Sequence, residues 1–165
     1  MKQLWAPWRM PYLDDSGPRY GCVLCAKSSE GDDEQNYVVY RGPLCFVMLN
    51  LYPYNSGHLM VVPYQHVGQL PQLQPETGAA VFTTAQLAVQ AIQEVMKPEG
   101  FNLGLNQGEV AGAGIADHIH LHVVPRWGGD TNFMPIMADA TVMPELLSAT
   151  ATKLRPAFHR ITQTQ

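Results

Sequence analysis

The sequence has little charge and no long apolar run. Charged residues make up 15% of the 165 residues, the formal net charge is −4, and nowhere do about 18 consecutive apolar residues occur. A slightly acidic chain lacks the basic field that holds a nucleic acid through counterion release. We therefore expect no nucleic acid and no membrane as partners. The start of the chain has no apolar segment of signal-peptide length, which predicts a cytoplasmic protein.

Cysteine is also scarce, with only Cys22, Cys25 and Cys45. An odd number of cysteines argues against a disulfide framework and favours a reducing compartment. Cys22 and Cys25 have the spacing of a metal knuckle or of a redox motif. The redox alternative lacks the preceding strand and following helix of a thioredoxin-like motif, so we favour the metal. Cys45 falls within an apolar run and is interpreted as a small buried hydrophobe.

Length and apolar content predict one compact α+β domain. With 46% apolar residues the chain can bury a full core. Apolar residues at helical spacing from Pro75 to Met96 predict one long helix, and the stretch after Pro144 predicts a short C-terminal helix that ends before Pro156. Strand-forming runs occur at residues 37–41, 44–51, 58–63, 101–106 and 118–125. We expect a roughly five-stranded antiparallel sheet with the long helix across one face.

Within a single domain over residues 1–165, we expect three parts. Residues 1–36 are rich in Pro, Gly and Asp and have no sustained period, which predicts an irregular N-terminal arm that carries the Cys pair. Residues 37–127 form the core of the domain. Residues 128–165 form a C-terminal extension.

Three histidines alternate along the last predicted strand. Successive side chains of a strand point to opposite faces, so His118, His120 and His122 share one face and the apolar residues between them face the core. Neighbouring imidazoles on that face lie about 6.6 Å apart, which is too wide for all three to bind one ion from an unbent strand. A solvated polar face would explain a single histidine. Three in register favour chemistry, because neutral imidazole is basic and nucleophilic near pH 7.

The loop before these histidines, residues 107–117, is rich in Gly and Ala. Small residues let backbone N–H groups approach and cradle an anion. Displacement at phosphorus needs donors on the phosphate oxygens and a nucleophile opposite the leaving group. A glycine-rich loop alone is weak evidence for a phosphate site. Next to three histidines, it predicts one.

The run His-Ile-His-Leu-His-Val-Val at residues 118–124 resembles the H-φ-H-φ-H-φ-φ signature of the histidine triad (HIT) superfamily, in which φ is apolar. The resemblance extends from residues 4–9 to about Pro144 and includes residues 50–66. Residues 125–135 are similar to the branch that contains bacterial diadenosine tetraphosphate phosphorylases. The resemblance implies a HIT-like fold and a nucleotidyl hydrolase or transferase.

The resemblance also implies roles for individual residues. His120 would attack the α-phosphate of an adenine nucleotide and form a covalent AMP-histidine intermediate, which water or phosphate then resolves. His122 would contact a phosphate oxygen, and His58 would support the nucleophile. Asn50 matches a position that bonds the ribose hydroxyls, with a strand-end turn residue as the alternative, and Asn106 matches one that faces the phosphates.

One departure from the family pattern concerns the phosphate loop. Many relatives carry Ser, Thr or Gln where this chain has Gly114 and Ile115. We therefore expect the backbone amides of Gly112 and Gly114 to carry more of the phosphate contact.

The resemblance completes the ligand set for the Cys pair. A tetrahedral zinc site needs two ligands besides Cys22 and Cys25. His66 and His118 correspond to the two His ligands of zinc-bearing members such as galactose-1-phosphate uridylyltransferase, which the Cys-x-x-Cys run also resembles. Such a zinc ion would be structural, with no open position, and would fix the strand that carries His120.

The predicted function is attack on the α-phosphate of adenine dinucleotides, with phosphorolysis or hydrolysis of diadenosine tetraphosphate as the reaction. Two alternatives stay open: a purine nucleotide-binding regulatory protein with little catalysis, and a nucleoside phosphoramidate hydrolase. The family commonly pairs its long helix and one strand across a two-fold axis, so we expect a homodimer.

Overall fold

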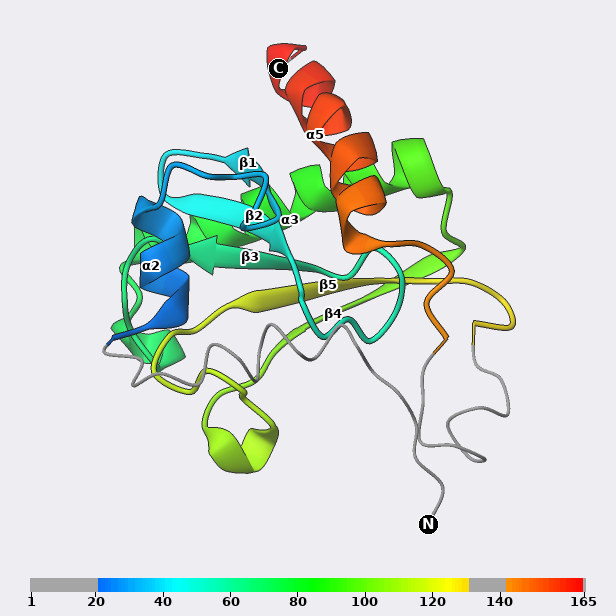
Figure 1. Cartoon of the computed structure of the whole chain (residues 1–165). Coiled ribbons are helices and arrows are strands. Elements are labelled where there is room, and N and C mark those ends of the chain that lie inside the picture. Colours follow the sequence, from blue (N-terminus) through cyan, green and yellow to red (C-terminus); the bar gives the residue numbers. More distant parts are fainter. Residues whose placement is uncertain (1–20, 131–141, 165) are drawn as a thin grey trace.

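Five strands form a single antiparallel sheet in a computed structural model that describes residues 21–130 and 142–164. Figure 1 shows the sheet with its helices. The strands, in spatial order, are β1 (Val38–Arg41), β2 (Cys45–Leu49), β3 (Leu59–Pro63), β5 (Leu121–Arg126) and β4 (Gly100–Leu105). The predicted α+β class with a five-stranded antiparallel sheet is confirmed. Two segments of the family resemblance, residues 4–9 and 131–135, lie outside the described residues.

Helices α3 (Pro75–Met96) and α5 (Leu147–Gln163) cover one face of the sheet. Small side chains of α3, including Ala85 and Ala88, are buried against strand residues such as Val61 and Val123. Alanine at these positions lets the helix lie close to the β-branched surface of the sheet. The long helix has the predicted bounds.

Helix α5 is longer than predicted, because it continues through Pro156 to Gln163. A proline inside a helix removes one hydrogen bond and crowds the preceding turn, at a cost of about 3 kcal/mol. Beyond the proline, Ala157 and Phe158 are fully buried, and the Phe158 ring stacks on Tyr40 at 5.3 Å between centroids. Burial of this apolar turn offsets the cost. The predicted end before Pro156 was therefore wrong.

The opposite face of the sheet carries a short helix, α2 (Val23–Ser29), where the sequence predicted an irregular arm. Its one buried residue, Leu24, packs with apolar side chains of β2 and β3 such as Phe46 and Met60. Arg41 donates to the carbonyls of Lys27 (3.0 Å) and Ser28 (2.7 Å), which satisfies acceptors at the helix end. Seven residues are too few for a helical period to be recognised from sequence.

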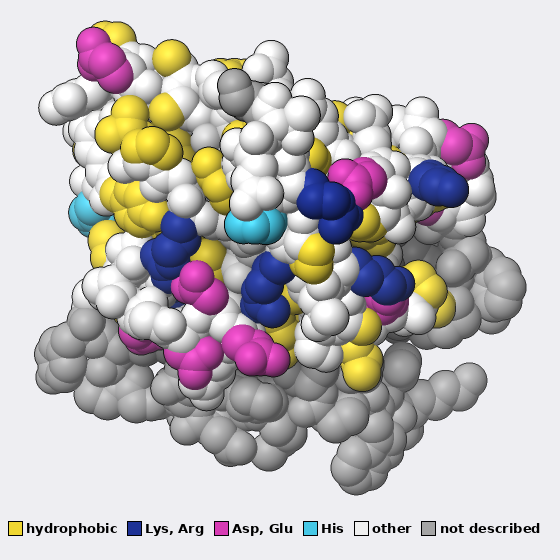
Figure 2. Space-filling view, turned by 90° about the horizontal axis from the view of Figure 1, so that it is seen from above, with side chains coloured by type: hydrophobic (Ala, Val, Ile, Leu, Met, Phe, Trp, Pro, Cys, Tyr) yellow, Lys and Arg dark blue, Asp and Glu magenta, His cyan; other side chains and the backbone are white. Residues whose placement is uncertain are grey.

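Within residues 21–130 and 142–164, the other regular elements are two single 3-10 turns, η2 (Leu70–Gln72) and η3 (Glu109–Ala111). None of the helices in the described ranges is both long enough and apolar enough to span a bilayer. On the face drawn in Figure 2, Lys and Arg side chains lie among Asp and Glu rather than forming a region of one sign. Ion pairs such as Arg41–Asp33 and Arg160–Glu94 agree with this mixed pattern.

Candidate functional site

The three alternating histidines lie just before β5 (Leu121–Arg126) and at its second residue, and all are buried. Strand β5 begins at Leu121 rather than at residue 118, so His118 and His120 precede it. Leu121 and Val123 belong to the core under α3, and His122 pairs with Met60 on the other face. The exposed fractions of His118, His120 and His122 are 0%, 5% and 9%. A merely solvated polar face does not explain three buried imidazoles.

His120 holds its imidazole in one defined tautomer. Its Nδ1–H donates to the backbone carbonyl of His118 at 2.9 Å, and a carbonyl can only accept. The proton therefore sits on Nδ1, and Nε2 keeps its lone pair. Burial lowers the pKa of His120 below its ordinary value, so the ring is neutral near pH 7. A neutral imidazole with a free Nε2 is a nucleophile.

His122 and His58 form a chain that ends on a backbone amide. The N–H of Tyr54 donates to Nδ1 of His58 at 3.0 Å, so His58 carries its proton on Nε2. That Nε2–H donates to Nδ1 of His122 at 2.9 Å. Nδ1 of His122 is thus an acceptor, and its proton lies on Nε2. His122 presents an N–H donor although it is uncharged.

The pKa values agree with this chain of neutral rings. Burial, with the nearby His122 and His120, lowers the pKa of His58 to about 3. Burial and His120 lower the pKa of His122 to about 4. The rings of His120 and His122 lie 4.8 Å apart between centroids, so a second positive charge beside the first is strongly disfavoured. The structure places His58 against His122 and not directly against the expected nucleophile.

Asn50 and Asn106 both take part in local turns. The Asn50 side-chain oxygen accepts the N–H of Tyr52 at 2.9 Å, and its amide nitrogen lies 3.5 Å from Nδ1 of His58. Asn106 donates to the carbonyl of Gly112 at 3.3 Å. Both therefore shape the loops around the histidines, and their nucleotide contacts stay predictions.

Within the glycine-rich loop, the backbone amides differ in availability. Gly108 and Gly112 have φ of +84° and +85°, a region that favours glycine. The N–H of Gly112 donates to the carbonyl of Glu109 at 2.9 Å. This differs from the expectation of an amide free for phosphate: the 3-10 turn η3 uses it to close the loop. A side chain at Gly114 would meet no atom within 4 Å, so this position is open.

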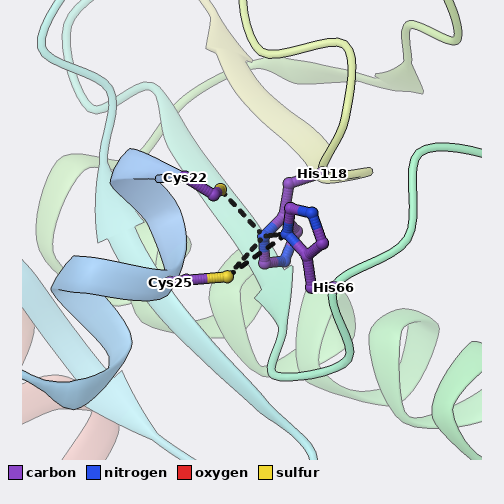
Figure 3. A group of neighbouring side chains, drawn as sticks. All are labelled: Cys22, Cys25, His66 and His118. Carbon is purple, nitrogen blue, oxygen red and sulfur yellow. Dashed lines mark hydrogen bonds between the residues drawn. The ribbon is translucent and has the colours of Figure 1, made fainter. Parts of the chain in front are cut away.

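Cys22, Cys25, His66 and His118 come together in one cluster (Figure 3). The Nδ1 atoms of the two histidines lie 3.3 Å apart, and each lies 3.3 Å from one cysteine sulfur. All four ligand atoms fall within 4.8 Å of one another. Zn–N bonds of about 2.0 Å and Zn–S bonds of about 2.3 Å give tetrahedral edges of similar length, so the donor set fits zinc. The four predicted ligands are brought together as a group that can hold a metal ion.

The tautomer of His118 also suits a metal ligand. Its Nε2–H donates to the carbonyl of Pro63 at 2.9 Å, which leaves the Nδ1 lone pair facing the sulfurs. The helix α2 that begins after Cys22 shows that one argument used against a redox motif, a missing helix, was wrong. The two histidines beside the Cys pair are what favour a metal.

His118 connects the two groups of histidines. Its ring belongs to the cluster of Cys22, Cys25, His66 and His118 (the cysteine cluster), and its backbone carbonyl accepts the hydrogen bond from Nδ1–H of His120. A ligand that holds the His118 ring in place would therefore also hold the His118 carbonyl, which sets the tautomer of His120.

Sequence reasoning missed Tyr54, whose backbone N–H begins the chain through His58. Its ring lies 4.7 Å from that of His58 and 5.8 Å from that of His122, between centroids. The signal was weak, because Tyr54 falls in a cluster of turn residues where an exposed aromatic side chain is common.

Comparison with known proteins identifies a family match and several similar proteins. Residues 32–129 match the HIT domain family. The AP-4-A phosphorylase of Mycobacterium tuberculosis is 42% identical over 167 residues, covering 97% of this chain and 86% of that protein. The asymmetrical bis(5'-nucleosyl)-tetraphosphatase of Schizosaccharomyces pombe is 33% identical over 93 residues, covering 56% of this chain and 50% of that protein. A zinc-bound histidine triad family protein from Mycobacterium smegmatis has a TM-score of 0.71 at 27% identity, covering 88% of this chain and 98% of that chain.

Proposed function

The chain belongs to the HIT domain family, and from that premise we propose that it is an enzyme that cleaves diadenosine tetraphosphate through a covalent AMP adduct on His120. The observation that carries the proposal is the pair formed by His120 and His122. One ring keeps an unprotonated Nε2 and the other an Nε2–H, and each state is fixed by a backbone group. A nucleophile and a donor side by side are what transfer at phosphorus needs.

In the first step, the lone pair of Nε2 of His120 attacks the α-phosphorus of one adenosine half. A P–N bond forms while the P–O bond to the bridging oxygen breaks, and the electron pair leaves with that oxygen on ATP. The adduct carries a positive charge on the imidazole, whose Nδ1–H stays bonded to the carbonyl of His118. The Nε2–H of His122 donates to a non-bridging oxygen, where negative charge develops.

In the second step, an oxygen of inorganic phosphate attacks the same phosphorus and the P–N bond breaks. The product is ADP, and His120 returns to its neutral form. If water is the acceptor instead, the product is AMP and one proton is released. The relative named AP-4-A phosphorylase supports phosphate, whereas the tetraphosphatase supports water as the second candidate acceptor.

The flanking polar residues have supporting roles in this proposal. Asn50 bonds the ribose hydroxyls from its place beside His58, and Asn106 faces the phosphates. The open position of Gly114 lets its backbone amide approach a phosphate oxygen, while Gly112 shapes the loop.

For the cluster of Cys22, Cys25, His66 and His118 we propose zinc, supported by the donor set and by the zinc-bound relative in M. smegmatis. When bound, zinc supplies a closed four-ligand cross-link with no position for substrate. The two cysteines tie α2 to the histidines, and the His118 ring keeps its backbone carbonyl in place for His120.

We also propose that residues 1–165 act as one domain in a cytoplasmic homodimer. The three cysteines, all in the described residues, form no disulfide with one another, which favours a reducing compartment. Strand β4 lies at the edge of the sheet and exposes Leu103, which supports pairing with a second copy there. Light scattering coupled to gel filtration tests the dimer, and a mass of one chain would contradict it.

The acceptor is tested by incubating diadenosine tetraphosphate with the enzyme in two tubes, with and without inorganic phosphate. Phosphorolysis gives ATP and ADP in the first tube. Identical products in both tubes would reject phosphorolysis, and no cleavage in either would reject the function.

A further inference from the structure

A recess of about 290 Å³ lies on the same face of the sheet as His122. Side chains alternate along β5, so Val124 and Arg126 point to the face of His122. On β4, Asn102 pairs with Val124, and Gly104 pairs with His122. The recess therefore adjoins the histidines across two neighbouring strands. It is lined by Tyr54, Asn55, Asn102, Val124, Arg126 and Asp130.

The surface between the histidines and the recess is open. Gly104 has no side chain, and a Cβ there would meet no atom within 4 Å. Tyr54 spans the gap, since its ring lies 5.8 Å from that of His122 and also lines the recess. With 59% of its surface exposed, this ring offers a free aromatic face. A ligand held at His122 can extend into the recess along this face.

Hydrogen bonds fix the side chains that line the recess, and the positive charge of one of them is paired with a negative charge. Arg126 donates to both oxygens of Asp130, at 2.6 and 2.9 Å, and to the side-chain oxygen of Asn102 at 2.8 Å. Asn55 donates to Asp130 at 2.7 Å and to the carbonyl of Pro125 at 3.1 Å. Because the Asp130 charge offsets that of Arg126, the recess has no net positive charge to attract a phosphate.

Resting on the proposed function, we propose that this recess binds the nucleoside of the leaving group, which is the second nucleoside of a dinucleoside polyphosphate. The base of this nucleoside stacks on the Tyr54 ring, and the side-chain amide of Asn102 forms a hydrogen bond with the base. Stacking on an aromatic ring suits any base, and the volume of the recess is close to the lower limit of about 300 Å³ for small-ligand sites. Val124 is four residues from His120, about 13 Å along an extended chain, so a long polyphosphate bridge is needed to reach it.

The test compares kcat/KM for diadenosine tetraphosphate and for adenosine tetraphosphate, which has the same phosphate chain but no second nucleoside. We expect the wild type to prefer the dinucleotide by about tenfold. Tyr54→Ala should abolish most of this preference, and Asn102→Ala should lower it about fivefold. Thr152→Ala, at an exposed position of α5 on the other side of the sheet, is the control and should keep the preference.

Because the Tyr54 ring also contacts His58, any loss common to both substrates is assigned to the histidines, and only the ratio reports on the recess. A wild-type ratio near one, or equal losses on both substrates in both variants, would overturn the proposal while leaving the proposed function intact. Failure of the wild type to cleave either substrate would instead contradict the proposed function.

Discussion

Two groups of histidines meet at His118 and use the imidazole ring in opposite ways. In the cysteine cluster, His66 and His118 direct Nδ1 toward one point shared with two sulfurs. In the other group, His58 and His122 pass hydrogen bonds from ring to ring, and His120 turns Nδ1 to a backbone carbonyl. The first group brings its ligand atoms to one point that could hold a metal ion. The second leaves Nε2 of His120 with a free lone pair and Nε2 of His122 with a proton.

The difference comes from backbone partners and not from the imidazole itself. A carbonyl, of Pro63 for His118 and of His118 for His120, places the proton on the nitrogen that faces it. A backbone N–H, that of Tyr54, does the reverse for His58. Three main-chain groups, the carbonyls of Pro63 and His118 and the N–H of Tyr54, thus decide which nitrogen is free for chemistry.

Replacing His120 by alanine should separate the two groups most sharply. We expect kcat to fall by about 10⁴-fold or more, because the attacking atom is lost. The four ligands of the cysteine cluster are unchanged, so bound zinc should remain at one equivalent. Steady-state kinetics and metal analysis check both parts. Activity within tenfold of the wild type would contradict the role of His120.

Replacing His58 by leucine should leave the metal in place and remove the donor that fixes His122. We expect kcat to fall about 100-fold with a smaller change in KM, because the His122 tautomer is no longer set. Nitrogen-15 NMR of the imidazoles should show the proton of His122 shared between its two nitrogens. An unchanged His122 spectrum would show that the chain from Tyr54 is irrelevant.

Replacing Cys22 by serine tests whether loss of the metal site affects the histidines proposed for catalysis. We expect zinc below a tenth of an equivalent, a melting temperature lower by roughly 10 °C, and kcat lower by about tenfold. The kinetic loss follows from a less ordered carbonyl of His118. Cys45→Ala is the control, because Cys45 is buried away from the cluster, and it should keep its zinc. Full activity without metal would show that the two groups are independent.

The smallest effect concerns the pH dependence of stability. His58 and His122 have pKa values of about 3 and about 4 when folded, against about 6.5 when unfolded. The unfolded chain therefore binds more protons below pH 6.5, and the free energy of unfolding decreases as the pH falls toward 4. With two such groups, we expect a loss of about 2.7 kcal/mol per pH unit between about pH 5.5 and 4.5, and about half that slope in His58→Leu, measured by urea unfolding. Equal slopes for both proteins would contradict the assignment.

Much of this arrangement could be predicted from sequence because it depends on alternation along one strand. The alternation placed His122 on the face away from the core, and the spacing of the family pattern identified the four cysteine-cluster residues. Strand β5 was predicted to begin at residue 118, but the loop continues to His120. Strand propensity does not mark that boundary, because the same side chains alternate on both sides of it.

Other features depend on tertiary contacts that have no local pattern. The partnership of Tyr54 with His58 joins a backbone amide to a ring, and any residue except proline could supply that amide. The recess beside Asn102 and Arg126 forms only when β4 and β5 pair. Helix α5 passes Pro156 because Phe158 is buried against Tyr40, a contact 118 residues apart in sequence that no window detects.

The covalent adduct is the most direct test of the central claim. Enzyme is mixed with diadenosine tetraphosphate in the absence of phosphate, quenched in base within milliseconds, and measured by intact-protein mass spectrometry. We predict a mass increase of one adenylyl group (AMP less water), located on His120 by peptide mapping, and its loss with formation of ADP when phosphate is added before the quench. Turnover without any adduct, or an adduct on another residue, would contradict the account.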